Sequence, residues 1–200
     1  MPTIKEIAKA CNVSVATVSN IINHKGSVGD ATRERVEQVI REMNYTPNYV
    51  AKNLKTKNTR SIGVIAEDMT VFALPDIIDG ITEYCEEEDY QILLVNLRLY
   101  KKFQDNYYRD NRHKEIVRQE IQKLLAKQVE GIIYVAAHER LINIIPEDLP
   151  IPTVVAYGFT GSEKIPSVVV KDIKGAYDLV RYIVSKGHQK IGVIAGKKES

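Results

Sequence analysis

The side chains best suited to chemistry with another molecule lie on one short stretch, residues 14–23. Val18, Ile21 and Ile22 recur at the spacing of one helix face and are expected to point inward. The opposite face then carries small, hydroxyl and amide side chains: Val15, Ala16, Ser19, Asn20 and Asn23. Such a face on a short helix can contact base edges and thymine methyl groups in the DNA major groove.

A preceding helix is expected to hold this face in position. Thr3 and Glu6 have the spacing of a capping box, which predicts a helix that begins at Ile4. Ile7 and Ala8 lie on the same face of that helix as Ile4 and would pack inward. The two helices together are typical of a helix-turn-helix, although any small helical hairpin shows the same periodicity.

A tight turn and a third helix complete the predicted unit. Asn12 tolerates the left-handed backbone that the turn requires, and Ser14 can cap the second helix. Residues 30–43 are predicted to form a third helix, with Asp30 in its first turn. Its inward stripe is Val36, Val39, Ile40 and Met43.

Positive charge is concentrated at the amino-terminal end. Residues 1–60 carry ten Lys and Arg against five Asp and Glu, a net charge of +5, whereas the remainder has a net charge of −3. Residues 48–60 alone carry +4 with a weak helical pattern. We expect this segment to be disordered off DNA and helical on it; a plain flexible tether is the alternative.

The rest of the chain has the pattern of an α/β domain. Apolar strands are predicted at residues 62–66, 91–95, 131–136, 153–157, 167–170 and 190–195, and amphipathic helices at residues 75–87, 114–127 and 173–186. This alternation indicates a parallel sheet covered on both faces. Residues 97–113 form a long polar, tyrosine-rich connection, either a loop near a ligand or an insertion, and we favour the insertion.

Composition and motifs argue against several other classes of protein. The chain has no run of about 20 apolar residues and no signal-peptide core, so we expect a cytoplasmic protein without membrane contact. The two cysteines and four histidines show no metal-ligand spacing. No nucleophile elbow or glycine-rich phosphate loop is present. An enzyme, a cofactor and a metal site are therefore not expected.

Four motifs occur together in order: TIKEIA at residues 3–8, VSVATVS at 13–19, TRERV at 32–36 and YTPN at 45–48. They resemble the amino-terminal signature of the LacI/GalR family of bacterial transcription repressors, and the resemblance extends to the last residue. It implies a three-helix helix-turn-helix DNA-binding domain and a hinge helix, followed by a partial periplasmic-binding-protein-like domain with a doubly wound parallel sheet. The implied bounds are residues 1–46, 47–60, 61–160 for the first effector lobe and 161–200 for the start of the second.

Chains of this family run well past 300 residues, so the resemblance also suggests a fragment or a truncated product. One βαβ unit buries too little surface to be stable by itself. We therefore expect residues 160–200 to be poorly folded alone.

The resemblance assigns DNA contacts to individual residues. Val15, Ala16 and Asn20 would read bases, and Asn20 suits adenine where many relatives carry an arginine. Phosphate contacts are expected from Ser14, Thr17, Ser19, Asn23 and His24, although Ser14 is equally consistent with a pure N-cap; Thr3 is a further predicted DNA contact. In the hinge, Leu54 resembles the family's minor-groove wedge, with Ala51 and Lys55 beside it. Gly29 replaces the serine that usually caps the third helix.

The effector candidates are polar or aromatic residues near the predicted strand ends: Asp68, Phe72, Asn96, Arg98 and Asp172. Ala73 and Leu74 replace an aromatic pair common in the family, and Lys171-Asp172 replaces an Asp-Asn pair. A sugar is expected from the family alone. Asp68, Asn96 and Arg98 are equally consistent with solvated strand-end residues.

The expected function is repression of a carbohydrate-utilisation operon. A homodimer would bind double-stranded, pseudo-palindromic operator DNA, and a small-molecule effector would change the angle between the lobes and the spacing of the hinges. The alternatives are a small-molecule (sugar) binding module without a DNA role and a non-functional repressor fragment.

Overall fold

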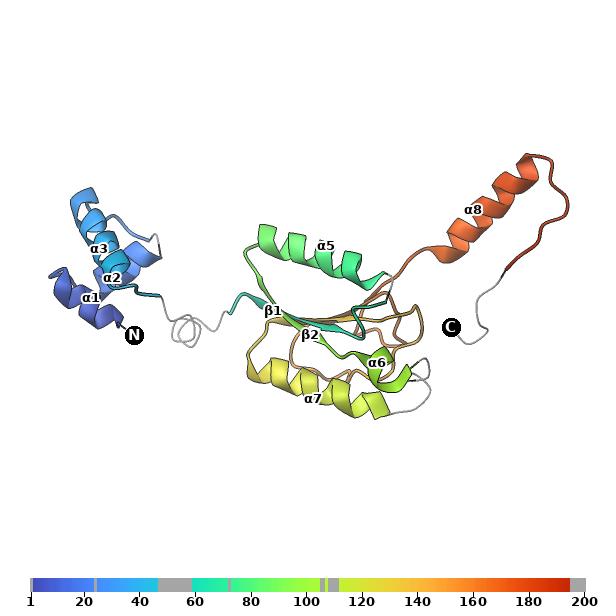
Figure 1. The fold of residues 1–200 in the computed structure, drawn as a ribbon, viewed down its shortest axis with the longest axis horizontal. Coiled ribbons are helices and arrows are strands. Elements are labelled where there is room, and N and C mark those ends of the chain that lie inside the picture. Colours follow the sequence, from blue (N-terminus) through green and yellow to red (C-terminus); the bar gives the residue numbers. More distant parts are fainter. Residues whose placement is uncertain are drawn as a thin grey trace. The chain divides into compact units, whose positions relative to one another are not determined.

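The computed structural model contains two compact units, residues 1–57 and 58–200. It describes residues 2–23, 25–46, 59–71, 73–104, 107 and 112–194. Figure 1 shows the elements of each unit. Among these residues, no helix is long and apolar enough to cross a membrane.

The amino-terminal unit is a three-helix bundle. Its helices are α1 (Ile4–Ala10), α2 (Val15–Ile22) and α3 (Asp30–Glu42). Their inward faces meet in a small core of six buried residues: Ile7, Ala8, Cys11, Val18, Ile21 and Val36. The predicted periodicity of all three helices is therefore confirmed.

Local signals in the sequence fix the helix ends. Glu6 closes the predicted capping box by accepting the Thr3 backbone N–H at 2.6 Å. Asn12 adopts the left-handed backbone with φ of 50° and turns the chain after α1. Ser14 caps α2 by accepting the Thr17 N–H at 3.0 Å. No side chain caps α3 at Gly29, as the glycine predicts.

The second unit contains a five-stranded sheet. Its strands are β1 (Ser61–Ala66), β2 (Gln91–Asn96), β3 (Gly131–Val135), β4 (Thr153–Ala156) and β5 (Ser167–Val168). They pair in the order β2-β1-β3-β4-β5, and every pair is parallel.

Helices cover both faces of this sheet, as predicted. α5 (Leu74–Glu87) lies on one face and α7 (Arg112–Ala126) on the other (Figure 1). The central strands β1 and β3 are almost continuously buried, which explains their unbroken apolar sequences. Ala66 is level with Asn96 of β2 and Val135 of β3, so these three strands end at the same edge.

Two predictions near the end of the chain are wrong. Residues 190–194 form no strand, and β5 has two residues instead of the predicted four. A strand needs a neighbour to pair its backbone groups, and an apolar sequence alone does not supply one. The helix between them, α8 (Asp172–Ser185), is amphipathic as predicted but has no buried residue.

The described part of the connection after β2 has structure that its polar composition did not predict; that the connection is an insertion stays a prediction. It contains a short helix, α6 (Leu99–Phe103), whose first residue is fully buried. Tyr107 is only 1% exposed and belongs to the main core. The described part of this connection therefore packs into the core of the second unit. Its polar composition did not indicate this packing.

Replacing Ile7 by Ala should lower the free energy of unfolding of the amino-terminal unit by about 2–5 kcal/mol. The substitution removes a fully buried side chain from a core that has few other members. The measurement is hydrogen exchange of the α1–α3 amides in the full chain. Lys5→Ala, an exposed change on the same helix, is the control and should alter the value by less than about 0.5 kcal/mol. Equal effects of the two changes would contradict this packing.

Candidate nucleic-acid interface and ligand edge

The outer face of α2 presents the three predicted base-reading residues together. Val15, Ala16 and Asn20 are exposed, whereas Val18 and Ile21 on the opposite face are buried. The helix therefore offers one amide and two apolar side chains to a partner. An amide can make a bidentate contact to adenine, and small apolar groups fit the thymine methyl.

Several other predicted DNA contacts already hold helix ends. The Ser14 hydroxyl lies 2.8 Å from that of Thr17, and the Asn23 amide donates to the Ser19 carbonyl at 2.7 Å. The Thr3 hydroxyl donates to the Glu6 carboxylate at 3.1 Å. These side chains therefore stabilise the shape of the unit. A phosphate oxygen only accepts hydrogen bonds, so a contact to it requires one of these hydroxyl protons to turn from its present partner, and the phosphate contacts stay predictions.

Five predicted site residues lie outside the part of the chain that the structure describes: His24, Ala51, Leu54, Lys55 and Phe72. Their roles stay predictions.

The predicted ligand residues of β1 and β2 meet at the carboxyl edge of the sheet. Asp68 accepts the Thr70 hydroxyl at 2.6 Å and the Tyr100 N–H at 3.0 Å. Burial by itself would raise the pKa of Asp68, but the bonds from Thr70 and from the N–H groups of Lys101 and Tyr100 hold it below its ordinary value. Asp68 is 1% exposed and thus fixes the loops around the edge.

Asn96 has a similar positioning role. Its side-chain oxygen accepts the Arg98 N–H at 3.1 Å and the Met69 N–H at 3.4 Å. Arg98 has a left-handed backbone with φ of 54° and immediately precedes α6. Asp172 stands apart at the start of α8, and within the described residues no hydrogen bond joins it to Asp68, Asn96 or Arg98.

Sequence reasoning missed the densest polar cluster of this edge, which centres on Glu67. Its carboxylate is fully buried and accepts the hydroxyls of Tyr134 at 2.5 Å and Tyr107 at 2.9 Å. It also accepts the Ala137 N–H at 2.8 Å. Arg140 pairs with both carboxylate oxygens, at 2.5 and 3.0 Å. Two features of the sequence could have indicated this cluster. Glu67 directly follows the apolar strand β1, and Arg140 comes shortly after the apolar strand β3.

Electrostatics favour the charged forms of this pair. Burial would raise the pKa of Glu67, but the hydrogen bonds and charge of Arg140, with the Ala137 N–H and the Tyr134 hydroxyl, hold it below its ordinary value. Burial and the Glu67 charge raise the pKa of Tyr134 and of Tyr107, so both hydroxyls stay protonated as donors. The Glu67 network therefore locks the ends of β1 and β3 to Tyr107 of the α6–α7 connection.

A cavity of about 480 Å³ lies at the opposite edge of the sheet. It is bounded by the starts of several strands and the end of α5, and its lining includes Ile62, Cys85, Tyr90, Ile132, Val154 and Pro166. Ligands of open parallel sheets bind at the carboxyl ends of the strands. The mainly apolar lining of this cavity suits an apolar group better than a sugar. The sugar site therefore stays a prediction for the edge with Asp68 and Asn96, which we call the ligand edge after the residues predicted there.

Comparisons with known families agree with the two units. Residues 3–48 match the profile described as bacterial regulatory proteins, lacI family. Residues 59–200 match periplasmic binding proteins and sugar binding domain of LacI family.

Named relatives extend this agreement. The chain is 31% identical over 199 residues to the HTH-type transcriptional repressor PurR of Vibrio atlanticus, covering 98% of this chain and 55% of that protein. It is 32% identical over 200 residues to the HTH-type transcriptional regulator RegA of Clostridium saccharobutylicum, covering 99% and 56%. The chain thus spans slightly more than half the length of these relatives.

Two solved structures share the fold. The Lac repressor dimer bound to operator and the anti-inducer ONPF matches with a TM-score of 0.74 and 24% identity, covering 94% of this chain and 54% of that one. A LacI-family regulator from Silicibacter pomeroyi matches with a TM-score of 0.62 and 20% identity, covering 95% and 54%.

Replacing Arg140 by Met should lower the free energy of unfolding of the second unit by about 3–5 kcal/mol at pH 7, because it leaves the Glu67 charge buried and unpaired. In the wild type, the pKa of Glu67 is lower in the folded protein than in the unfolded chain. Ionised Glu67 therefore stabilises the folded state at pH values above the ordinary glutamate pKa, and this stabilisation is lost as pH falls through the pKa of the folded protein. In the variant, uncompensated burial raises that pKa, so the deficit should shrink as pH falls from 7 to 5.

Urea unfolding at the two pH values measures this effect. The double variant Glu67→Gln/Arg140→Met removes the unpaired charge and should recover part of the loss. Glu147→Gln, an exposed carboxylate in the β3–β4 connection, is the matched control and should be neutral. A deficit that is identical at both pH values would contradict the assigned charge state.

Proposed function

Because the chain belongs to the LacI family of bacterial regulatory proteins, we propose that it is a transcriptional repressor that reads operator DNA with α2. The single observation that carries the proposal is the exposed face of Val15, Ala16 and Asn20 on a helix whose other face is buried. A helix of this kind in a helix-turn-helix enters the major groove. The similarity to PurR repressors over 98% of the chain supports the same role.

The proposal assigns each side chain a part in recognition. Asn20 makes a bidentate contact to adenine N6 and N7, and Val15 and Ala16 contact thymine methyl groups. Ser14, Thr17 and Ser19 bond phosphates and set the position of the helix without reading sequence. Relatives with an arginine at the position of Asn20 would prefer guanine there.

The complete regulator is proposed to act as a homodimer on a pseudo-palindromic operator, since two-fold symmetry of the protein requires two half-sites. Support comes from the Lac repressor, whose structure is that of a dimer bound to operator. The division into residues 1–46, 47–60, 61–160 and 161–200 belongs to this proposal.

A sugar-like effector and control of a carbohydrate operon complete the proposal. The matching of residues 59–200 to a sugar binding domain supports this ligand class. Contacts are assigned to Asn96 and Arg98 at the carboxyl edge of the sheet, and to Phe72 and Asp172. Asp68 holds the edge in shape and contributes through the loops that it orders.

Replacing Asn20 by Arg should change one base of the preferred half-site from adenine to guanine, because an arginine pairs with guanine O6 and N7. Selection from random duplexes measures the preference, and discrimination at that base should be about 5- to 150-fold. Gln38→Arg adds the same charge to an exposed site on α3 and should leave the preference unchanged. Identical preferences for the wild type and Asn20→Arg would contradict the assignment.

Binding to the selected duplex should weaken steeply with salt. If about six phosphates are neutralised, log K should fall with log salt at a slope of about −5. Titrations between about 50 and 200 mM salt measure this slope, and a scrambled duplex should give weaker binding with a similar slope. A flat response would mean that phosphates are not the partner of the basic amino-terminal region.

A further inference from the structure

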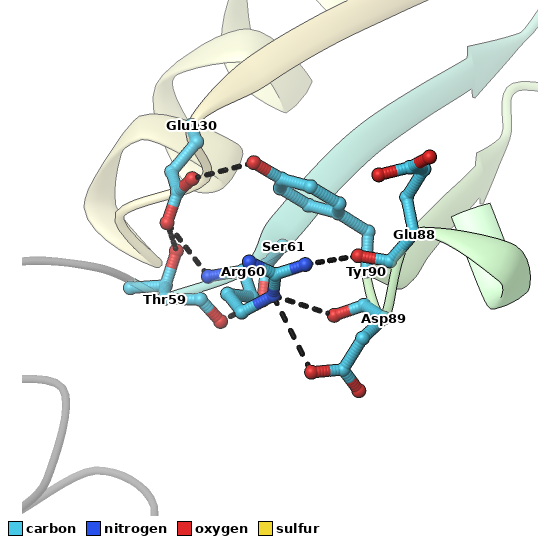
Figure 2. Close-up of polar contacts among 7 residues, drawn as sticks. All are labelled: Thr59, Arg60, Ser61, Glu88, Asp89, Tyr90 and Glu130. Atoms are coloured by element: carbon cyan, nitrogen blue, oxygen red, sulfur yellow. Dashed lines mark hydrogen bonds and ion pairs between the residues drawn. The ribbon is translucent and has the colours of Figure 1, made fainter.

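The last two residues of the predicted linker, Thr59 and Arg60, enter a polar cluster at the amino edge of the sheet (Figure 2). We call it the edge clamp and define it as Thr59, Arg60, Asp89, Tyr90 and Glu130. The cluster joins three segments that lie far apart in the sequence: the entry to β1, the turn between α5 and β2, and the start of β3.

The Glu130 carboxylate binds the two residues that lead into β1. It accepts the Arg60 backbone N–H at 2.6 Å, the Tyr90 hydroxyl at 3.4 Å and the Thr59 hydroxyl at 3.5 Å. The Thr59 hydroxyl also donates to the Gln128 carbonyl at 2.7 Å. Hydrogen bonds to a charged acceptor are roughly twice as strong as neutral ones, so Glu130 is the main fixed point of the clamp.

The Arg60 side chain holds the end of α5. Its Nε donates to the Asp89 carbonyl at 2.8 Å, and Nη2 donates to the Glu88 carbonyl. The guanidinium lies 4.6 Å from the centre of the Tyr90 ring. Carbonyls at a helix end carry partial negative charge and lack partners within the helix, so a cation there closes and stabilises α5.

The backbone of Arg60 shows that this arrangement is imposed by its contacts. Arg60 has φ of 45°, a left-handed conformation that a non-glycine residue adopts at a cost in conformational energy. The residue persists there because its N–H is bound by Glu130 and its carbonyl accepts the Gln91 N–H at 2.7 Å. The direction in which the chain enters β1 is therefore fixed.

α5 connects the edge clamp to the ligand edge. The helix begins at Leu74, shortly after the loop that Asp68 orders, and the carbonyl of its C-cap, Glu88, accepts a hydrogen bond from Arg60 of the clamp. Its fourteen residues span about 21 Å at the usual rise of an α-helix. A displacement of the loops at the ligand edge thus has a rigid path to Arg60, where the predicted linker ends.

We propose that the edge clamp positions the point from which the linker departs, with Glu130 as the positioning residue, and couples that point to α5. The inference rests on the proposed function, because the linker matters only if it tethers a DNA-binding unit. A fixed departure point raises the effective concentration of a second DNA-binding unit at its half-site. A loosened clamp frees residues 59 and 60 to join the tether and lowers that concentration.

The test compares Glu130→Ala with Glu130→Gln, which retains an oxygen for the Arg60 N–H. Hydrogen exchange of assigned amides in the full chain should show Arg60 exchanging about 10- to 100-fold faster in the Ala variant, with the β3 amides unchanged. The Gln variant should restore most of the protection. Glu147→Ala, an exposed glutamate outside the clamp, is the matched control.

The second readout is DNA binding to a duplex selected with the wild type. Glu130→Ala should bind the full inverted repeat about 1.3- to 2-fold more weakly, because the tether grows from about 12 to about 14 residues and effective concentration falls at least as the −3/2 power of its length. Its affinity for a single half-site should stay unchanged, because only the tether is altered. Glu130→Gln should bind the inverted repeat nearly as well as the wild type. A merely structural defect would weaken binding to both duplexes.

These measurements distinguish a failure of the clamp proposal from a failure of the proposed function. An unchanged Arg60 exchange rate in Glu130→Ala, or equal binding of that variant and the wild type to the inverted repeat, would overturn the clamp alone. A wild type without any preference for a DNA sequence would overturn the proposed function, and with it the coupling role of the clamp.

Discussion

The parallel alignment of β1 between β2 and β3 is the constraint on which the second unit depends. Because these strands run in the same direction, the chain enters all three at one edge and leaves them at the other. The entering edge holds Arg60 and Glu130, and the leaving edge holds Glu67 and Asp68. The proposed tethering point and the proposed ligand residues thereby lie at opposite ends of the same strands.

The Glu67–Arg140 pair illustrates how the leaving edge is kept rigid. Taking two charges out of water is costly, and such a pair is weak grounds for inferring added stability. It does impose a geometry, since every bond to the Glu67 carboxylate has a direction, and the donors come from the end of β3 with the residues just after it and from Tyr107 of the α6–α7 connection. The edge at which we propose a ligand site thus has fixed surroundings.

Local and periodic signals predicted most of the fold. Thr3, Asn12 and Ser14 marked helix ends through chemistry within a few residues, and the apolar strands identified the sheet. The failures concern long-range contacts. The bond from Tyr107 to Glu67 joins residues 40 positions apart, so composition gave no sign of it. The apolar residues 190–194 resembled a strand, but pairing depends on a neighbour that no local pattern reports.

We propose that this chain recognises an inverted repeat in DNA through paired copies of α2. Sedimentation of the full chain, alone and with duplexes carrying an inverted repeat or its scrambled sequence, is the decisive experiment. We expect a complex of two chains per duplex on the inverted repeat and no stable complex of that size on the scrambled sequence. Equal binding to both duplexes, or none to either, would contradict it.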